Sequence, residues 1–203
     1  MRRVRTNSSK TAQPAVTRLI NLRGTNGSGK TYLVRRWMQE VGALPYPRRK
    51  NLFGTDTLCG PIQYYKLSDG GIVIGSYENN CGGCDTLGSF AEVENALWER
   101  LKERPPYILF EGVIVSHIYG YWLEFSKKAG GMTWEFLDTP VDECLRRIYV
   151  RNRNKPINEG YVHEKHKAIH TVSVKARRDG ETVVVLPWQT AYEAFVKLME
   201  KRK

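Results

Sequence analysis

Eight residues near the N-terminus combine the types and the spacing needed to hold phosphate. They fit the pattern G-x-x-x-x-G-K-[ST] and are Gly24, Thr25, Asn26, Gly27, Ser28, Gly29, Lys30 and Thr31. Glycines at these positions let successive backbone N–H groups turn inward around an anion, because a side chain would block the approach. We expect the lysine to reach the β- and γ-phosphates and the threonine hydroxyl to ligate Mg²⁺. The pattern therefore predicts binding of a nucleoside triphosphate, with ATP and Mg²⁺ as the expected cofactors.

Three acidic residues are candidates for the rest of a phosphoryl-transfer site. Such a site needs a group that holds the metal and a base that accepts or orients the proton of the acceptor hydroxyl. Glu111 follows an apolar run, Asp85 lies in a glycine-rich segment before a helix, and Asp56 follows the first helix. We favour Asp85 as the base, then Asp56, with Glu111 near the metal. Each acid taken alone could equally be a helix cap or a surface residue.

Apolar runs and helical patterns alternate along the chain after residue 15. The expected strands are 16–22, 62–67, 71–77, 107–112, 132–138 and 182–187, and the expected helices are 30–41, 89–104, 139–153, 161–178 and 190–201. An Asp-Gly turn joins the second and third strands into a hairpin, whereas the proline-punctuated segment 43–61 indicates irregular structure. Ser89 is expected to cap the second helix, and Thr139 the third, with Pro140 as its first residue. This order predicts an α/β fold, a doubly wound parallel sheet with an inserted β-hairpin, and ligands at the carboxyl ends of its strands.

The charge of the chain points to a polyanionic partner. Its 203 residues carry 32 Lys and Arg against 21 Asp and Glu, a net charge of +11. Residues 146–178 alone hold ten basic residues against two acidic ones. Such a cluster is typical of nucleic-acid binding, although a solvated surface or the basic lid of a kinase would also account for part of it. We therefore predict DNA as a partner and leave the oligomeric state open.

The N-terminal segment differs from the rest of the sequence. Residues 1–15 are basic and polar, lack the apolar centre of a secretory signal, and are expected to form a flexible arm ahead of a domain at 16–203. No apolar run reaches the length of a membrane span. We therefore expect no membrane association and a cytoplasmic location.

Four cysteines raise the question of a zinc site. Cys81 and Cys84 form a lone C-x-x-C, and Cys59 and Cys144 lie elsewhere in the chain. Zinc would need a further ligand from far away, such as His117 or His163, because no second pair follows. We favour reduced thiols in a tight loop.

The segment around residues 137–153 resembles the start of the lid in small P-loop kinases. An apolar strand ends at Asp138, Thr139-Pro140 follows, and the next helix carries Arg147 and Arg151. The 5′-polynucleotide kinases are the closest in pattern, and in that family the lid arginines clamp phosphates and stabilise the transferred phosphoryl group. The resemblance implies these roles for the two arginines and a lid at about 146–160; Arg146 and Arg153 match less well. A guanidinium suits phosphate oxygens, and residues four apart share one helix face.

A narrower resemblance is to phage P-loop kinases that phosphorylate 5-hydroxymethyluracil within DNA. It rests on size, basicity and four short segments, 24–31, 82–86, 110–112 and 137–140. None of these segments reads a base. An aromatic run at 117–125 could line the acceptor pocket, with core packing as the alternative for Tyr119, Tyr121, Trp122 and Phe125. The resemblance implies an ATP-dependent kinase that acts on the hydroxymethyl group of a DNA base.

Other functions remain open at this stage. A 5′-polynucleotide kinase, a small-molecule kinase for a nucleoside, nucleotide or sugar, and a nucleic-acid-binding ATPase without transfer chemistry would share the phosphate loop. A GTPase is disfavoured because no Asn/Thr-Lys-x-Asp segment is present, and a motor ATPase because the chain is too short.

Overall fold

A mostly parallel sheet forms the centre of the molecule. The computed structural model describes residues 16–50, 55–79 and 82–200, so the predicted arm at 1–15 lies outside the described residues. Seven strands in these ranges share one sheet in the order β2-β5-β6-β7-β1-β8-β9. They are β1 (Arg18–Arg23), β2 (Ala43–Tyr46), β5 (Tyr64–Leu67), β6 (Ile72–Ile74), β7 (Tyr107–Glu111), β8 (Thr133–Asp138) and β9 (Thr182–Pro187). From β6 to β9 every pairing is parallel, which confirms the predicted α/β sheet.

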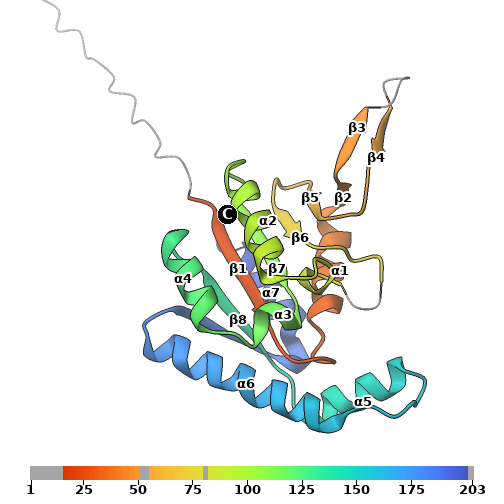
Figure 1. The fold of residues 1–203 in the computed structure, drawn as a ribbon, viewed down its shortest axis with the longest axis vertical. Helices are drawn as coiled ribbons and strands as arrows, with labels where there is room; N and C mark the ends of the chain where they lie inside the picture. The colour runs from red at the N-terminus through yellow and green to blue at the C-terminus, as the bar shows by residue number, and fades with distance from the viewer. Residues whose placement is uncertain (1–15, 51–54, 80–81, 201–203) are drawn as a thin grey trace, which may run out of the picture.

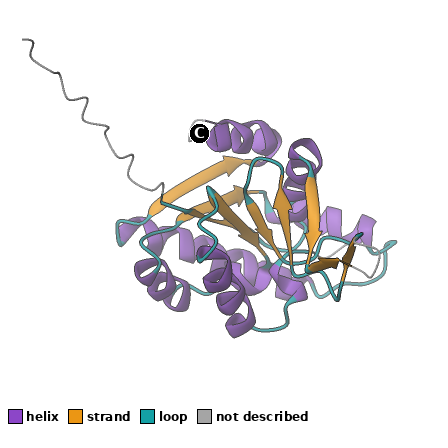
Figure 2. Ribbon diagram, turned by 90° about the horizontal axis from the view of Figure 1, so that it is seen from above, coloured by secondary structure: helices purple, strands orange, loops and turns teal. Residues whose placement is uncertain are grey.

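Helices cover both faces of this sheet, as Figure 2 shows. One hydrophobic cluster packs α1 (Lys30–Val41) and α7 (Ala191–Glu200) on one face. A second cluster contains residues of α2 (Phe90–Leu101), α3 (Val113–Ser116), α4 (Gly120–Lys128) and α6 (Glu159–Arg178). Because successive strand side chains point to opposite faces, Leu19 belongs to one cluster and Ile20 to the other. α5 (Val141–Arg151) lies beside α6 at one end of the molecule (Figure 1).

The register of the central strands sets the position of the site. Leu22 of β1 lies opposite Glu111 of β7, and Arg23 opposite Phe136 of β8. The segment 24–29 therefore leaves the sheet between the carboxyl ends of two parallel neighbours. This is the edge where ligands gather in folds of this class.

The predicted hairpin is confirmed, because β5 and β6 pair antiparallel. The expectation of irregular structure over 43–61 was wrong for 43–46, 48–50 and 56–58, which are strands, while 51–54 lie outside the described residues. β2 extends the sheet by pairing with β5, and β3 (Arg48–Lys50) pairs with β4 (Asp56–Leu58) in a separate ribbon that projects from the body (Figure 1). Proline does not exclude a strand here, because Pro45 lies in the edge strand β2, and an edge strand tolerates a residue that lacks an N–H on its unpaired side.

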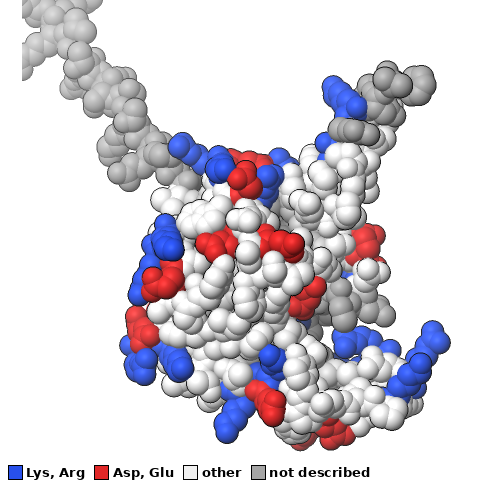
Figure 3. Space-filling view, viewed as in Figure 1, with Lys and Arg blue, Asp and Glu red and all other residues white. Residues whose placement is uncertain are grey.

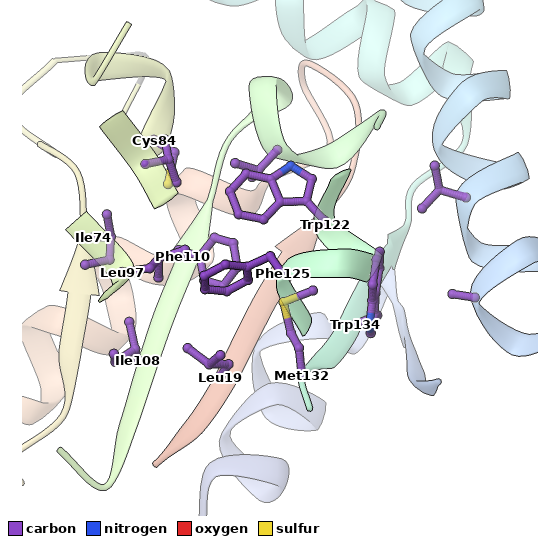
Figure 4. Packing of buried hydrophobic residues seen from close by; sticks show 14 of the residues in the cluster. Leu19, Ile74, Cys84, Leu97, Ile108, Phe110, Trp122, Phe125, Met132 and Trp134 are labelled. Carbon is purple, nitrogen blue, oxygen red and sulfur yellow. The ribbon is translucent and has the colours of Figure 1, made fainter. Parts of the chain in front are cut away.

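The aromatic run at 117–125 contributes mainly to the core. Trp122 and Phe125 are buried and contact Phe110 and Trp98 respectively, and Figure 4 shows the two residues among the side chains of the second cluster. Tyr121 is 38% exposed. The core reading is thus confirmed for Trp122 and Phe125, and no residue of this run lines the pocket described below.

The remaining elements are two short 3₁₀ turns, η1 (Cys84–Thr86) and η2 (Trp188–Thr190). As predicted, Ser89 caps α2, since its side chain accepts a hydrogen bond from the Glu92 N–H at 3.2 Å. No helix in the described ranges has the length and apolar character needed to cross a membrane.

Candidate active site

The segment 24–29 forms a loop that only glycines permit at two points. Gly27 and Gly29 have φ values of +76° and +105°, in the region that disfavours residues with a Cβ. A Cβ at Gly27 would also collide with the carbonyl oxygen of Cys144 in α5. The loop therefore packs closely against α5. Gly27 is required both for its positive φ and for this close approach.

Lys30 begins α1 and folds back across the loop. Its ammonium group is buried and donates hydrogen bonds to the carbonyl oxygens of Gly24 (2.8 Å) and Thr25 (3.2 Å). The first turn of α1 contains no acidic residue, so no carboxylate there competes for the positive end of the helix dipole. The lysine and the helix terminus together make this corner a binding site for an anion.

Thr31 and Glu111 meet at the base of the loop. The Thr31 hydroxyl donates a hydrogen bond to Glu111 Oε1 at 3.0 Å, which joins the start of α1 to the end of β7. Glu111 is 1% exposed, and burial raises the pKa of its carboxyl to about 7, against the opposing effects of Lys30 and the Thr31 hydrogen bond. The hydroxyl and the carboxylate are hard oxygen ligands of the kind that Mg²⁺ prefers.

Asp85 lies across from this pair in η1. Its Oδ2 accepts a hydrogen bond from the Val113 N–H (2.9 Å) and its Oδ1 from the Ile114 N–H (2.8 Å), so it caps α3. Close packing requires glycine here, because a Cβ on Gly112 would lie 2.9 Å from Asp85 Oδ1. The cap fixes an exposed carboxylate at the rim of the site.

Two arginines of α5 line the site, and one of them contacts the loop. Arg147 Nη1 donates to the carbonyl oxygens of Ser28 (3.1 Å) and Gly27 (3.4 Å), while its Nε pairs with Glu143 at 2.7 Å. Hydrogen bonds from Arg146 and Arg147 lower the pKa of Glu143 to about 2. Arg151 lies one turn further along the same helix and is exposed.

These groups surround one pocket of about 280 Å³, here called the phosphate pocket. Its lining comprises Thr25, Asn26, Gly27, Gly29, Lys30, Thr31, Tyr32, Arg35, Gly82, Asp85, Glu111, Val113, Arg147 and Arg151. Most of the residues predicted for the site thus converge. Asp56 does not, because it lies in the projecting ribbon and pairs with Arg48 at 3.2 Å. Arg153 is exposed beyond the end of α5 and is also absent from the lining.

A second pocket of about 520 Å³ adjoins the first and shares Gly29, Tyr32 and Arg147 with it. Its other walls are mostly apolar or aromatic and include Leu33, Leu137, Trp188 and Tyr192. The Arg147 guanidinium lies 5.4 Å from the centre of the Trp188 ring. We call this cavity the nucleobase pocket, after the role proposed for it below.

Sequence reasoning did not assign several contributors to the site, among them Tyr32, Arg35 and Val113 in the lining of the phosphate pocket and the contact of Thr139 with the loop. Arg35 lines the phosphate pocket from α1, and its spacing from Thr31, one helical turn, is the signal that could have identified it. Thr139 was predicted as the N-cap of α5, but Pro140 occupies that position and no side chain caps the helix. The buried Thr139 hydroxyl instead donates to the Ser28 carbonyl oxygen at 2.9 Å. A long-range acceptor therefore replaces the local cap.

No zinc site is found in the part of the chain that the structure describes. Within it, no group of three or more His, Cys, Asp or Glu residues could hold a metal ion. Cys81 lies outside the described residues. Burial raises the pKa of the Cys84 thiol, and that of Cys144 to about 11, so both favour the thiol form, which binds metals poorly.

Comparison with known proteins assigns a family to this arrangement. The sequence model of a family described as 5-hmdU DNA kinase matches residues 2–187. The chain belongs to the 5-hmdU DNA kinase family. It is 42% identical over 187 residues to the "5-hmdU DNA kinase" of Pseudomonas phage M6, covering 89% of this chain and 97% of that protein. It is 31% identical over 195 residues to the "5-hmdU DNA kinase" of Pseudomonas phage PaMx11, covering 92% and 99%.

Solved structures agree on the fold. A gluconokinase from Sinorhizobium meliloti superimposes with a TM-score of 0.51 at 15% identity, over 92% of this chain and 95% of that one. The family and the phosphate pocket together make this member a P-loop phosphotransferase. The predicted resemblance to 5-hydroxymethyluracil DNA kinases is thereby confirmed.

Proposed function

We propose that this protein transfers the γ-phosphoryl group of ATP to the hydroxymethyl group of 5-hydroxymethyluracil in DNA. The observation that carries the proposal is the family match across residues 2–187, which includes every residue of the phosphate pocket. The relatives are phage proteins. We therefore expect the enzyme to act in the cytoplasm of an infected host cell.

The two adjoining pockets support a pose for the nucleotide. Backbone N–H groups of the loop and the Lys30 ammonium would hold the phosphates, and the base would lie beside Arg147 and Trp188. Arg147 lines both pockets, so one guanidinium would contact the base with its face and the phosphates with its edge. Arg151 would add a second positive charge near the transferred group.

Thr31 and Glu111 fit a magnesium ion. Their hydroxyl and carboxylate lie 3.0 Å apart beside Lys30, and Mg²⁺ in kinases commonly uses one or two protein oxygens together with substrate phosphates. A bound Mg²⁺ would neutralise charge on the phosphate oxygens. We assign these two residues to the metal and expect Glu111 to be ionised when the ion is present.

Asp85 is the base that the site supports best. It lines the phosphate pocket, and its two amide contacts leave further lone pairs on both oxygens for an acceptor hydroxyl. In the proposed step Asp85 takes the proton of the hydroxymethyl group, whose oxygen forms a bond to the γ-phosphorus while the bond to the β-phosphate bridging oxygen breaks. The products are phosphorylated DNA, ADP and a proton.

The acceptor base must leave the DNA stack for this step. Its hydroxymethyl group lies in the major groove of a duplex, whereas the phosphate pocket is a concave site of about 280 Å³. The base would therefore be flipped out or presented in single-stranded DNA. Exposed basic side chains on α5 and α6 supply positive charge for the DNA backbone, among them Arg146, Arg151, Lys167 and Arg178. Figure 3 shows basic side chains along this edge, with acidic ones between them.

One labelling experiment separates this proposal from its alternatives. The protein is incubated with γ-labelled ATP, Mg²⁺ and one of three acceptors: plain DNA, the same DNA containing 5-hydroxymethyluracil, or free 5-hydroxymethyl-deoxyuridine. Label confined to the modified DNA supports the proposal. Label at the 5′ ends of plain DNA indicates a polynucleotide kinase, label on the free nucleoside alone a small-molecule kinase, and phosphate release without label an ATPase; each of these outcomes overturns the proposal. Lys30→Ala serves as the blank.

A further inference from the structure

Arg35 and Arg151 line the phosphate pocket alone, and of the two only Arg35 comes from α1. It lies on α1 one turn after Thr31 and lines the phosphate pocket, but it does not line the nucleobase pocket. The same is true of Asp85, the candidate base. Arg147, in contrast, lines both pockets. Arg35 thus shares with Asp85 a place in the phosphate pocket outside the nucleobase pocket.

Backbone carbonyl groups hold the Arg35 guanidinium in place. Nε donates to the carbonyl oxygen of Tyr77 at 3.0 Å, and Nη2 donates to the same oxygen at 2.6 Å and to that of Asn79. These carbonyls belong to the segment between β6 and η1, which leads to Asp85. A fork fixed in this way loses little conformational entropy when it binds a further ligand.

The positive charge of Arg35 has no carboxylate partner in the described residues. Arg147 pairs with Glu143 at 2.7 Å, Arg36 with Glu40 at 3.2 Å and Arg48 with Asp56 at 3.2 Å. Arg35 forms no such ion pair within the described ranges, and its Nη1 makes no hydrogen bond there. The carbonyl oxygens of Tyr77 and Asn79 accept hydrogen bonds from Arg35 but do not neutralise its positive charge. The pocket thus presents a positioned cation with unused donors.

We propose that Arg35 binds a backbone phosphate of the DNA acceptor strand next to the target nucleotide. The inference rests on the proposed function and names the contact that holds the acceptor. A base that reaches the γ-phosphate brings its own flanking phosphodiesters to the mouth of the pocket, and a guanidinium suits phosphate oxygens. Tyr32, three residues earlier on the same side of α1, is 68% exposed and lines the same pocket. An exposed aromatic ring beside a cation is the pairing that single-stranded nucleic acid favours.

The test measures DNA binding and transfer as a function of salt. Binding of a fluorescent oligonucleotide with one 5-hydroxymethyluracil is followed by anisotropy in the presence of ADP, from 50 to 300 mM KCl. Arg35→Gln should weaken binding roughly tenfold at low salt. It should also reduce the slope of log K against log salt by about 0.7 for a single strand. The KM for ATP should stay unchanged. Arg35→Lys should recover most of the slope because it keeps the charge.

A matched control and a second readout distinguish a DNA contact of Arg35 from a purely structural role of its hydrogen bonds to Tyr77 and Asn79. They also separate a failure of this inference from a failure of the proposed function. Lys102→Gln removes one exposed charge at the C-cap of α2, outside the lining of the phosphate pocket, and should leave the slope unchanged. If Arg35 were only structural, the slope of log K against log salt would be the same for Arg35→Gln and the wild type. That result would overturn the inference. A raised KM for ATP with unchanged DNA binding would also overturn it, because Arg35 would then be a nucleotide clamp. A wild type that binds the oligonucleotide with an Arg35-dependent slope but transfers no label to it would refute the proposed function and leave the DNA contact standing.

Discussion

Glu111 should make the nucleotide-free protein less stable as pH rises from about 4.5 to about 7. Burial raises the pKa of this carboxyl from 4.5 to about 7 in the folded state. Between these values the native protein holds a proton that the unfolded chain has released. The free energy of unfolding therefore falls as pH rises through this window and is constant above it, since stability falls wherever the native state binds more protons. Below pH 4.5 this contribution is fully present.

The size of the effect follows from the shift. A rise of about 2.5 pKa units, from 4.5 to about 7, corresponds to about 3 kcal/mol at 1.36 kcal/mol per unit. Glu111→Gln removes the titration but keeps a side-chain oxygen that can accept the Thr31 hydrogen bond. The difference in unfolding free energy, variant minus wild type, should therefore increase by about 3 kcal/mol between pH 4.5 and pH 7.5.

Urea unfolding of both proteins at half-unit pH steps, in EDTA and without nucleotide, measures this difference directly. EDTA matters because a bound metal would favour the ionised carboxylate and hide the shift. Comparison with the variant cancels the titration of every other group to first order. Stability curves that run parallel over the whole range would refute the reasoning, because they would mean that the carboxyl titrates alike in the folded and unfolded states.

Three further substitutions test the site. Lys30→Ala should abolish transfer to any acceptor, measured with γ-labelled ATP, because the phosphates lose their buried cation; residual transfer near wild-type rate would remove Lys30 from the machinery. Asp85→Asn should leave ATP binding intact, by calorimetry, and cut turnover by about 100-fold or more, the range expected for a lost general base; near-normal turnover would leave Asp85 as a helix cap only. Gly27→Ala should lower the free energy of unfolding by more than 1 kcal/mol, since φ is +76° and the new Cβ would collide with the Cys144 carbonyl; an unchanged urea midpoint would contradict the packing of the loop on α5.

The sequence predicted those parts of the site that depend on contiguous residues. The loop 24–31, the strand that ends at Glu111 and the helix that carries Arg147 each have a local pattern, and the structure brings them together. Asp56 had no such pattern, only a place after the first helix. The structure places it in a two-stranded ribbon, where it pairs with Arg48. The two strands of this ribbon are three residues long, with the sequences RRK and DTL, and therefore show no alternation of apolar and polar residues that would indicate strands.

Contacts between distant segments could not be read in advance. Thr139 has the residue type and position of an N-cap, and local rules favour that role. The structure satisfies its hydroxyl with the Ser28 carbonyl oxygen, 111 residues away in the sequence. Arg35 follows Thr31 by one helical turn, but the helical pattern alone does not tell that this face of the helix lines the pocket. The predicted cap would have made the Thr139 hydroxyl an acceptor, whereas tertiary packing makes it a donor.

The contacts between α5 and the phosphate loop bear on how the enzyme handles its nucleotide. Thr139 and Arg147 both donate to the Ser28 carbonyl oxygen, and Gly27 packs on the Cys144 carbonyl. These contacts join α5 to the loop and hold Arg147, the first of the two predicted lid arginines, against it. Groups fixed before binding cost no ordering free energy at the transition state. On this basis we expect substitution of Thr139 by Val to reduce turnover through misplacement of Arg147, with a smaller effect on the KM for ATP.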